Sequence, residues 1–335
     1  LMQVPAESYD KAVLYLRICS GGSVVIIAYN VISAILRGVG NANLPFLFVG
    51  IACVVNIAGD LLLTGLLHMD VAGVAIATVF AQLISVVISI LVLKKQELPF
   101  EFSGKQCRIY KRERNLILRV GVPIALQETT VQISFLVINS IVNHMGLLPS
   151  AGYGVAQKIV TFIMLIPSAI MQSVSAFVAQ NIGAGEKKRA AKGVVTAIVT
   201  GCSVGVVIFL AGFFGGSALS ALFTKDADVI SQSAAYLKGF APECILTCIL
   251  FSSTGYFNGC GNSLPVMIQG ITAAFCIRIP VSVFMAGLPD TSLTLVGLAA
   301  PITTLYGIVF FGICFVRLRA KGRKEFKSPK VEGRS

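Results

Sequence analysis

The chain has 335 residues, of which 56% are hydrophobic and 13% are charged, and its mean hydropathy is +0.85. A water-soluble protein of this length needs much more polar surface to cover its core, so the composition excludes a soluble globular protein and predicts an integral membrane protein. The nine cysteines have neither metal-ligand spacing nor the pattern of a disulfide framework, and the net charge of +12 needs a separate explanation.

Nine apolar segments are long enough to cross about 30 Å of hydrocarbon, which takes roughly 20 helical residues. In chain order they cover approximately residues 12–37, 44–67, 71–93, 116–144, 151–181, 190–215, 230–257, 265–287 and 293–316. Most connections between these segments are short, which favours antiparallel neighbours. The predicted fold is therefore an all-α, polytopic membrane helix bundle.

Basic residues explain the net charge, because they gather on alternate connections. They fill the stretch 94–115 after the third segment, follow the fifth segment, and recur in the stretch 317–335 after the ninth. The positive-inside rule places these regions in the cytoplasm, so 94–115 is predicted to be a cytoplasmic linker and 317–335 a cytoplasmic tail. These runs lie against membrane segments and lack interleaved aromatic residues, so we expect no nucleic-acid partner.

The chain contains an internal repeat, because residues 1–115 resemble residues 222–335. Residues 1–40 align with 222–261 without a gap, and after one skipped residue Leu44 and Pro45 align with Leu264 and Pro265. The three helices of 1–93 therefore match the last three helices of a complete six-helix lobe, 116–316. We predict two parallel-repeat lobes. The chain is then expected to be an N-terminal truncation of a parent with roughly 440 residues and twelve spans.

Several motifs resemble the multidrug and toxic compound extrusion (MATE) family. The stretches 154–159 and 179–186 resemble the two ends of the second helix of a lobe in that family. Residues 35–41 resemble its turn between the fourth and fifth helices, and residues 121–127 resemble the start of its seventh helix. The resemblance covers the chain up to about residue 320. It implies a transporter with its substrate cavity between two lobes.

Ionisable residues inside the predicted helices are informative, because a charge near the bilayer centre costs at least ~2.5–3.5 kcal/mol. The candidates are Asp60, Glu128, Lys158, Glu243 and Arg278. Asn56 lies one helical turn before Asp60 on the same face. This pair offers an amide oxygen and a carboxylate to one hard cation, or a carboxylate that holds a proton.

The resemblance adds a cation-coupling set around Asp60. In one branch of the family this set has a tyrosine and an asparagine on the fourth helix, Asn-x-x-x-Asp on the fifth and a threonine on the sixth. The matching residues of this chain are Tyr15, Asn30, Asn56, Asp60 and Thr78. The remaining member is an aspartate on the first helix, which is absent here. We expect Na⁺ or H⁺ as the coupling ion, no cofactor, and no metal beyond Na⁺ at Asp60.

The second lobe differs from another branch of the family, in which an aspartate on the tenth helix binds sodium. Thr247 occupies that position here, and Glu243 lies one turn earlier. Either the acidic residues contact the cation or a cationic drug, or they pair structurally with Arg278 or Lys158. The candidate residues of the substrate cavity are Gln127, Glu128, Glu243 and Thr247.

The predicted function is a cation-coupled multidrug efflux antiporter that works by alternating access. Catalytic and ATP-binding sequence motifs are lacking, so we expect transport driven by an ion gradient and not an enzyme. The expected substrate is a cationic or amphipathic organic compound. The expected location is the cytoplasmic membrane of a prokaryote, as a multi-pass monomer with a cytoplasmic C-terminus. The alternative is a lipid or glycolipid flippase of the same superfamily, which tends to carry several basic residues in its cavity.

Overall fold

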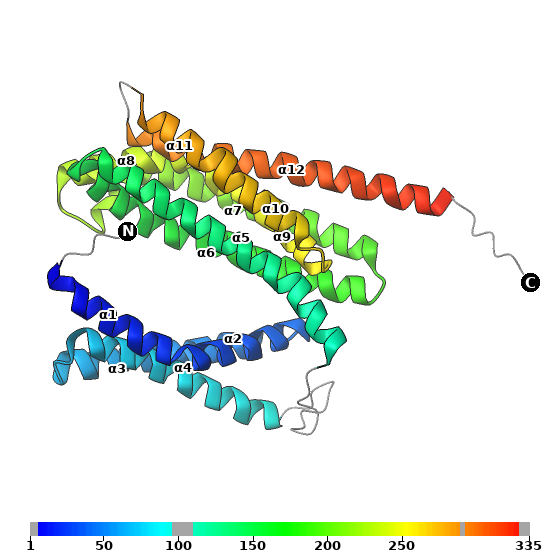
Figure 1. Ribbon diagram of the computed structural model, residues 1–335, viewed down its shortest axis with the longest axis horizontal. Coiled ribbons are helices and arrows are strands. Elements are labelled where there is room, and N and C mark those ends of the chain that lie inside the picture. The colour runs from blue at the N-terminus through cyan, green and yellow to red at the C-terminus, as the bar shows by residue number, and fades with distance from the viewer. Residues whose placement is uncertain (1–5, 96–109, 289–291, 328–335) are drawn as a thin grey trace, which may run out of the picture. The chain divides into compact units, whose positions relative to one another are not determined.

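The computed structural model describes residues 6–95, 110–288 and 292–327 (Figure 1). These residues form helices and no strand, so the predicted all-α bundle is confirmed. They divide into two compact units, Leu1–Arg108 and Ile109–Ser335.

The first unit is built around α4, against which the other helices of the unit pack. Its elements are α1 (Ala6–Gly21), α2 (Ser23–Gly38), α3 (Asn43–Asp60), the π-helical segment η1 (Leu61–Leu66) and α4 (Asp70–Lys95). Within this unit, α3 and α4 have the most extensive packing contact. Those two helices also carry Asn56, Asp60 and Thr78.

The second unit is a larger bundle, in which α9 packs between α6 and α7 and α8 packs against α6, α7 and α12 (Figure 1). Its elements are α5 (Lys111–His144), α6 (Leu147–Gly183), α7 (Lys187–Ala221), α8 (Ala227–Phe240), α9 (Glu243–Gly259), α10 (Leu264–Thr272), the π-helical segment η3 (Ala273–Arg278), α11 (Ile279–Ala286) and α12 (Leu293–Lys327). The helix formed by α10, η3 and α11 packs against α5 and α12.

The described helices agree with the predicted number of membrane segments. Seven are long and apolar enough to cross a bilayer, and the number is nine if α1–α2 and α8–α9 are each counted as one bent span. Large apolar side chains such as Phe46, Phe214 and Leu147 are 77–90% exposed, as expected where lipid replaces water at the surface.

Two predicted boundaries differ from the structure. Helix α5 begins at Lys111 and α12 continues to Lys327, so parts of the predicted linker 94–115 and tail 317–335 are helical. Lysine, arginine and glutamate are good helix formers, so a helix continues beyond its apolar segment. Residues 96–109 of the linker and 328–335 of the tail lie outside the described residues.

The internal repeat is visible in the backbone of the turns after α2 and α9. Gly40 and Gly261, which align in the repeat, both have positive φ, at +88° and +69°. The amide of Asn41 donates to the carbonyl of Leu36 at 2.9 Å, and the aligned amide of Asn262 donates to Phe257 at 3.0 Å. Glycine is needed here because an L side chain disfavours this conformation.

The repeat also preserves a bend by two different chemical means. The axes of α1 and α2 differ by 50° at Gly22, and those of α8 and α9 differ by 48° next to Pro242. Pro242 aligns with Gly21 of the first copy. Proline interrupts a helix by removing a backbone donor, whereas glycine lacks the side chain that restrains the backbone.

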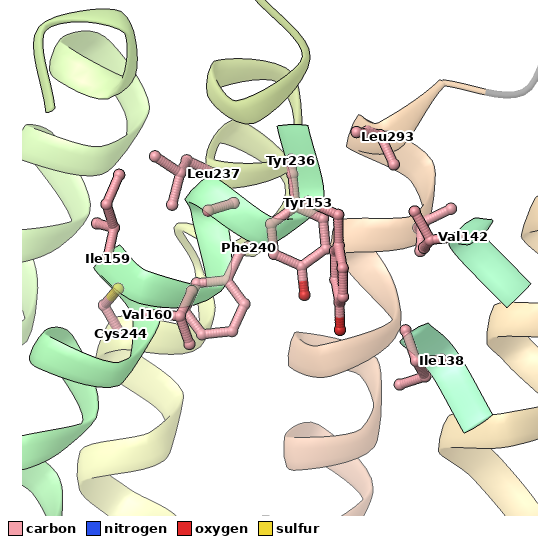
Figure 2. Packing of buried hydrophobic residues seen from close by; sticks show 12 residues of the cluster. Ile138, Val142, Tyr153, Ile159, Val160, Tyr236, Leu237, Phe240, Cys244 and Leu293 are labelled. Atoms are coloured by element: carbon pink, nitrogen blue, oxygen red, sulfur yellow. The ribbon is translucent and has the colours of Figure 1, made fainter. Parts of the chain in front are cut away.

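The main core cluster of the second unit contains three aromatic rings among aliphatic side chains, and small residues lie beside it. The rings of Tyr153 and Tyr236 meet edge to face at 5.0 Å between centroids, and Phe240 stacks on Tyr236 at 6.1 Å (Figure 2). Next to this cluster, Gly239 of α8 and Gly297 of α12 let the two backbones approach closely. A Cβ atom at Gly297 would lie 2.5 Å from the carbonyl oxygen of Tyr236. Small residues drive such close helix packing in membranes.

We expect Gly297→Val to destabilise the second unit by about 1–3 kcal/mol, because its side chain must push two helix backbones apart. Thermal unfolding of the purified protein in detergent measures the effect. Gly312→Val is the matched control on the same helix, since nothing lies within 4 Å of a Cβ atom added there. Equal unfolding temperatures for the two variants would contradict this account of the packing.

Candidate functional site

A cavity of about 230 Å³ lies in the first unit, at the contact of α3 with α4 and next to α2. Four of its lining residues are polar, namely Tyr29, Asn56, Thr78 and Gln82, and the others are Val49, Ala52, Cys53 and Ala81. A cavity with several polar lining residues within an apolar helix bundle is a candidate binding site, because polar residues inside a membrane are costly unless they have partners.

The structure brings the predicted residues Asn56 and Thr78 together across this cavity. The amide Nδ2 of Asn56 donates to the hydroxyl oxygen of Thr78 at 3.4 Å. Thr78 in turn donates its own hydroxyl to the carbonyl oxygen of Val74 at 2.9 Å. The amide oxygen of Asn56 takes no part in this chain of hydrogen bonds, so it is suited to coordinate a cation.

Asp60 lies one turn after Asn56, at the point where α3 passes into η1. Its Oδ1 is buried and has no hydrogen-bond partner among the described residues, as is also true of Thr64 Oγ1 and Gln82 Oε1. Leaving such a buried acceptor unpaired costs about 1–3 kcal/mol, and more if the group is charged. A cation or a proton at Asp60 would remove this cost.

Tyr15 and Asn30 relate differently to Asp60. Tyr15 on α1 lies within electrostatic range of the carboxylate of Asp60 and close to Cys19 on the same helix. Asn30 on α2 is exposed, and its Nδ2 donates to the carbonyl oxygen of Ile26 at 2.8 Å within the same helix. In this structure, therefore, Tyr15 lies within electrostatic range of Asp60, whereas Asn30 is engaged with its own backbone.

In the second unit, Glu243 is the centre of a buried polar cluster. Its side chain is 6% exposed, and Oε1 accepts hydrogen bonds from Thr247 at 2.6 Å and from Thr304 at 2.7 Å. Thr247 lies on α9 with Glu243, whereas Thr304 lies on α12. The second oxygen, Oε2, is buried without a partner in the described part of the chain. Glu243 thus links two helices and still has an unused acceptor.

Arg278 places a positive charge within electrostatic range of Glu243. Its guanidinium donates to Ser134 Oγ at 3.2 Å and lies 4.8 Å from the centroid of the Phe135 ring. It also interacts electrostatically with Glu243 and with Tyr153 and Tyr236, whose hydroxyls point the same way in Figure 2. The acid and the base therefore belong to one electrostatic cluster, while α5 holds the base by a hydrogen bond and a cation–π contact.

Glu128 and Gln127 have different surroundings on α5. Glu128 is exposed, whereas Gln127 is half-buried and packs against Gly270 of α10, where an added Cβ atom would collide with Gln127. Lys158, a possible partner of the acids, is exposed.

The sequence reasoning missed Gln82 and Tyr29, which line the cavity, and Thr304, which binds Glu243. Thr78 and Gln82 are four residues apart in one helix, so a search for polar residues at that spacing would have found Gln82. No such local signal exists for Thr304, because 61 residues separate it from Glu243.

We expect Thr304→Val to destabilise the protein by about 1–3 kcal/mol, because it removes one of the two donors to a buried carboxyl oxygen. Thermal unfolding in detergent measures the loss. Thr303→Val is the control, since Thr303 is also buried but donates to Ala299 of its own helix at 2.6 Å. A smaller loss for Thr304→Val than for Thr303→Val would show that the bond between helices contributes little.

Comparisons with known proteins agree with the resemblance seen in the sequence. Residues 123–284 match the MatE family model. The chain is 27% identical over 282 residues to the probable multidrug resistance protein YpnP of Bacillus subtilis, covering 84% of this chain and 62% of that protein. It is 26% identical over 289 residues to the probable multidrug resistance protein NorM of Thermotoga maritima, covering 83% and 61%. The chain thus spans less than two thirds of these relatives.

Solved structures show the same fold. A crystal structure of MATE in the straight conformation superposes with a TM-score of 0.89 at 20% identity, covering 95% of this chain and 72% of that chain. An outward-facing multidrug resistance MATE family transporter gives the same TM-score, identity and coverage. Together the comparisons show that residues 123–284 match the MatE family model and that the chain has the helical fold of the MATE structures.

Proposed function

We propose that this chain belongs to a cation-coupled multidrug efflux antiporter and carries the residues that bind the coupling ion. The observation that carries the proposal is the buried, unpartnered Oδ1 of Asp60, one helical turn from the Asn56–Thr78 hydrogen bond and its cavity. The names of the curated relatives support multidrug transport, including the multidrug export protein MepA of Staphylococcus aureus. The proposed activity is transport, with no chemical reaction.

The chemistry of the site suits Na⁺ or H⁺. A carboxylate, an amide oxygen and hydroxyls are hard oxygen ligands of the kind that Na⁺ accepts, and the same carboxylate can hold a proton. Either ion neutralises Asp60 and satisfies an acceptor that otherwise has no partner. Binding is therefore favourable even though the surroundings are apolar.

The position of Asp60 connects ion binding to helix geometry. The π-helical segment η1 begins at the next residue, Leu61, and the electrostatic partner Tyr15 lies on α1, which bends by 50° against α2. Irregular helical segments are common at functional sites because their hydrogen bonding can be rearranged at low cost. An ion at Asp60 would then favour one of the two conformations exchanged during alternating access.

The proposed substrate is a cationic or amphipathic organic compound. Glu128 is an exposed acid within a membrane segment of the second unit, and Glu243 has an acceptor oxygen without a partner among the described residues. Acidic groups in apolar surroundings attract organic cations. We further propose that the protein acts as a monomer in the cytoplasmic membrane of a prokaryote, with its C-terminus in the cytoplasm.

Arg278 is the observation that favours the alternative, a lipid or glycolipid flippase, because a half-buried guanidinium suits a phosphate headgroup. It interacts electrostatically with Glu243, and its guanidinium already donates to Ser134. An anionic headgroup would compete with both, so the antiporter is the better-supported function.

We expect Asp60→Asn to reduce gradient-driven efflux at least about tenfold, because the neutral amide cannot exchange charge with the coupling ion. The measurement is the export of a fluorescent organic cation from membrane vesicles containing the protein, under an imposed Na⁺ or H⁺ gradient. Undiminished efflux by the variant would remove Asp60 from the mechanism.

The control is Asp70→Asn, which changes the same chemical group at an exposed position paired only with Lys11 among the described residues. We expect its efflux to stay within about twofold of the wild type, because exposed ion pairs contribute little. Translocation of a fluorescent phospholipid in the same vesicles tests the alternative. Lipid translocation without cation export would support the flippase and contradict the antiporter.

A further inference from the structure

A groove of about 1010 Å³ runs between α6 and α7 of the second unit, away from the residues discussed above. Its walls are mainly apolar and include Leu165, Ile166, Ile170 and Phe177 of α6. Two basic residues of α7, Arg189 and Lys192, line one end. The groove is therefore apolar along its length and positively charged at one end.

The length of the groove matches one leaflet of a bilayer. It extends along α7 from Arg189 to Thr200, which corresponds to about 16 Å at the rise of an α-helix. Half of a hydrocarbon core of about 30 Å is about 15 Å. A molecule that fills the groove would thus span from the membrane surface to about the bilayer centre.

The charged end is arranged to receive an anion. Arg189 and Lys192 are three residues apart, so they lie on the same face of α7. The guanidinium of Arg189 lies 6.0 Å from the centroid of the Phe177 ring, which holds the positive charge over the end of the groove. Arginine binds phosphate through two parallel hydrogen bonds, and lysine adds a second charge.

The walls beyond this end offer little polar chemistry. Thr196, which also lines the groove, donates its hydroxyl to the carbonyl oxygen of Lys192 at 3.1 Å. Its methyl group therefore remains to contact a molecule in the groove. Gly193 leaves room for the Phe177 ring, with which an added Cβ atom would collide. An unbranched hydrocarbon chain fits such a wall better than a polar ligand does.

We propose that this groove binds an anionic phospholipid, with the phosphate at Arg189 and Lys192 and one acyl chain along α6 as far as Leu165. Three observations carry the proposal: the apolar walls, the length of one leaflet, and the charge complementarity at one end. The site does not depend on ion coupling at Asp60. Which lipid occupies the groove then depends on the headgroup charge of the surrounding lipids.

The test uses the fact that the chain contains no tryptophan. Leu165→Trp introduces a single fluorophore at the apolar end of the groove, and the protein is reconstituted with phosphatidylglycerol or phosphatidylcholine brominated on the acyl chains. Quenching gives the relative association constants of the two lipids. We expect brominated phosphatidylglycerol to bind at least about fivefold more strongly, because one basic residue near the membrane surface raises the association constant of an anionic lipid by about that factor.

Val199→Trp is the matched position, because Val199 and Leu165 are both 61% exposed but Val199 does not line the groove. We expect equal quenching by the two lipids there. The same preference at both positions would mean general attraction of anionic lipid, and no preference at either would mean that the groove does not select a headgroup. Either result would overturn the proposal.

Charge substitutions complete the experiment in the Leu165→Trp background. Arg189→Gln with Lys192→Gln should abolish the preference for phosphatidylglycerol. Lys187→Gln with Lys188→Gln removes the same number of charges from the same end of α7, but outside the groove. This second pair of changes should leave the preference for phosphatidylglycerol intact. These residues are exposed, so the variants should fold, and their unfolding temperatures check this. A preference that survives the first pair of changes would also overturn the proposal.

Discussion

The absence of water in the bilayer core constrains every part of this structure, because each polar group there must find its partner within the protein. The regular helices satisfy their own backbones, and the hydroxyls of Thr78 and Thr303 donate to carbonyl oxygens of their own helices. Glu243 Oε1 meets the same demand through bonds from Thr247 and Thr304. Asp60 Oδ1 and Glu243 Oε2 have no such partner among the described residues, and Asp60 is the one proposed above to bind the coupling ion.

The two copies of the repeat keep the same backbone geometry but differ in their interior chemistry. Both have a bend of about 50° in one span and a glycine with positive φ in the following turn. However, Asn56 and Asp60 align with Cys276 and Pro280, so the proposed oxygen ligands occur in the first copy only. The repeat therefore keeps the elements that shape the helices, while the residues proposed to bind an ion differ between the copies.

Helix packing in the second unit depends on side-chain size rather than on hydrophobicity, because lipid is as apolar as the helix surfaces. Where Gly239 and Gly297 meet, α8 and α12 approach until their backbones are in contact. Between α6 and α7 the helices leave the groove proposed to hold lipid. The same pattern of small and large residues thus decides where helices close together and where they leave space.

The sequence by itself determined the all-α class, the nine membrane segments, the repeat, and the pairing of Asn56 with Asp60 on one helix face. These features follow from hydropathy and from the helical period, which are local properties of the chain. Only the tertiary structure decided that Thr304 binds Glu243, that Gln82 joins the cavity, that Arg278 donates to Ser134 and that Asn30 bonds to its own helix. Those contacts depend on how helices rotate and approach each other. Side-chain shape sets that arrangement, and hydropathy does not encode it.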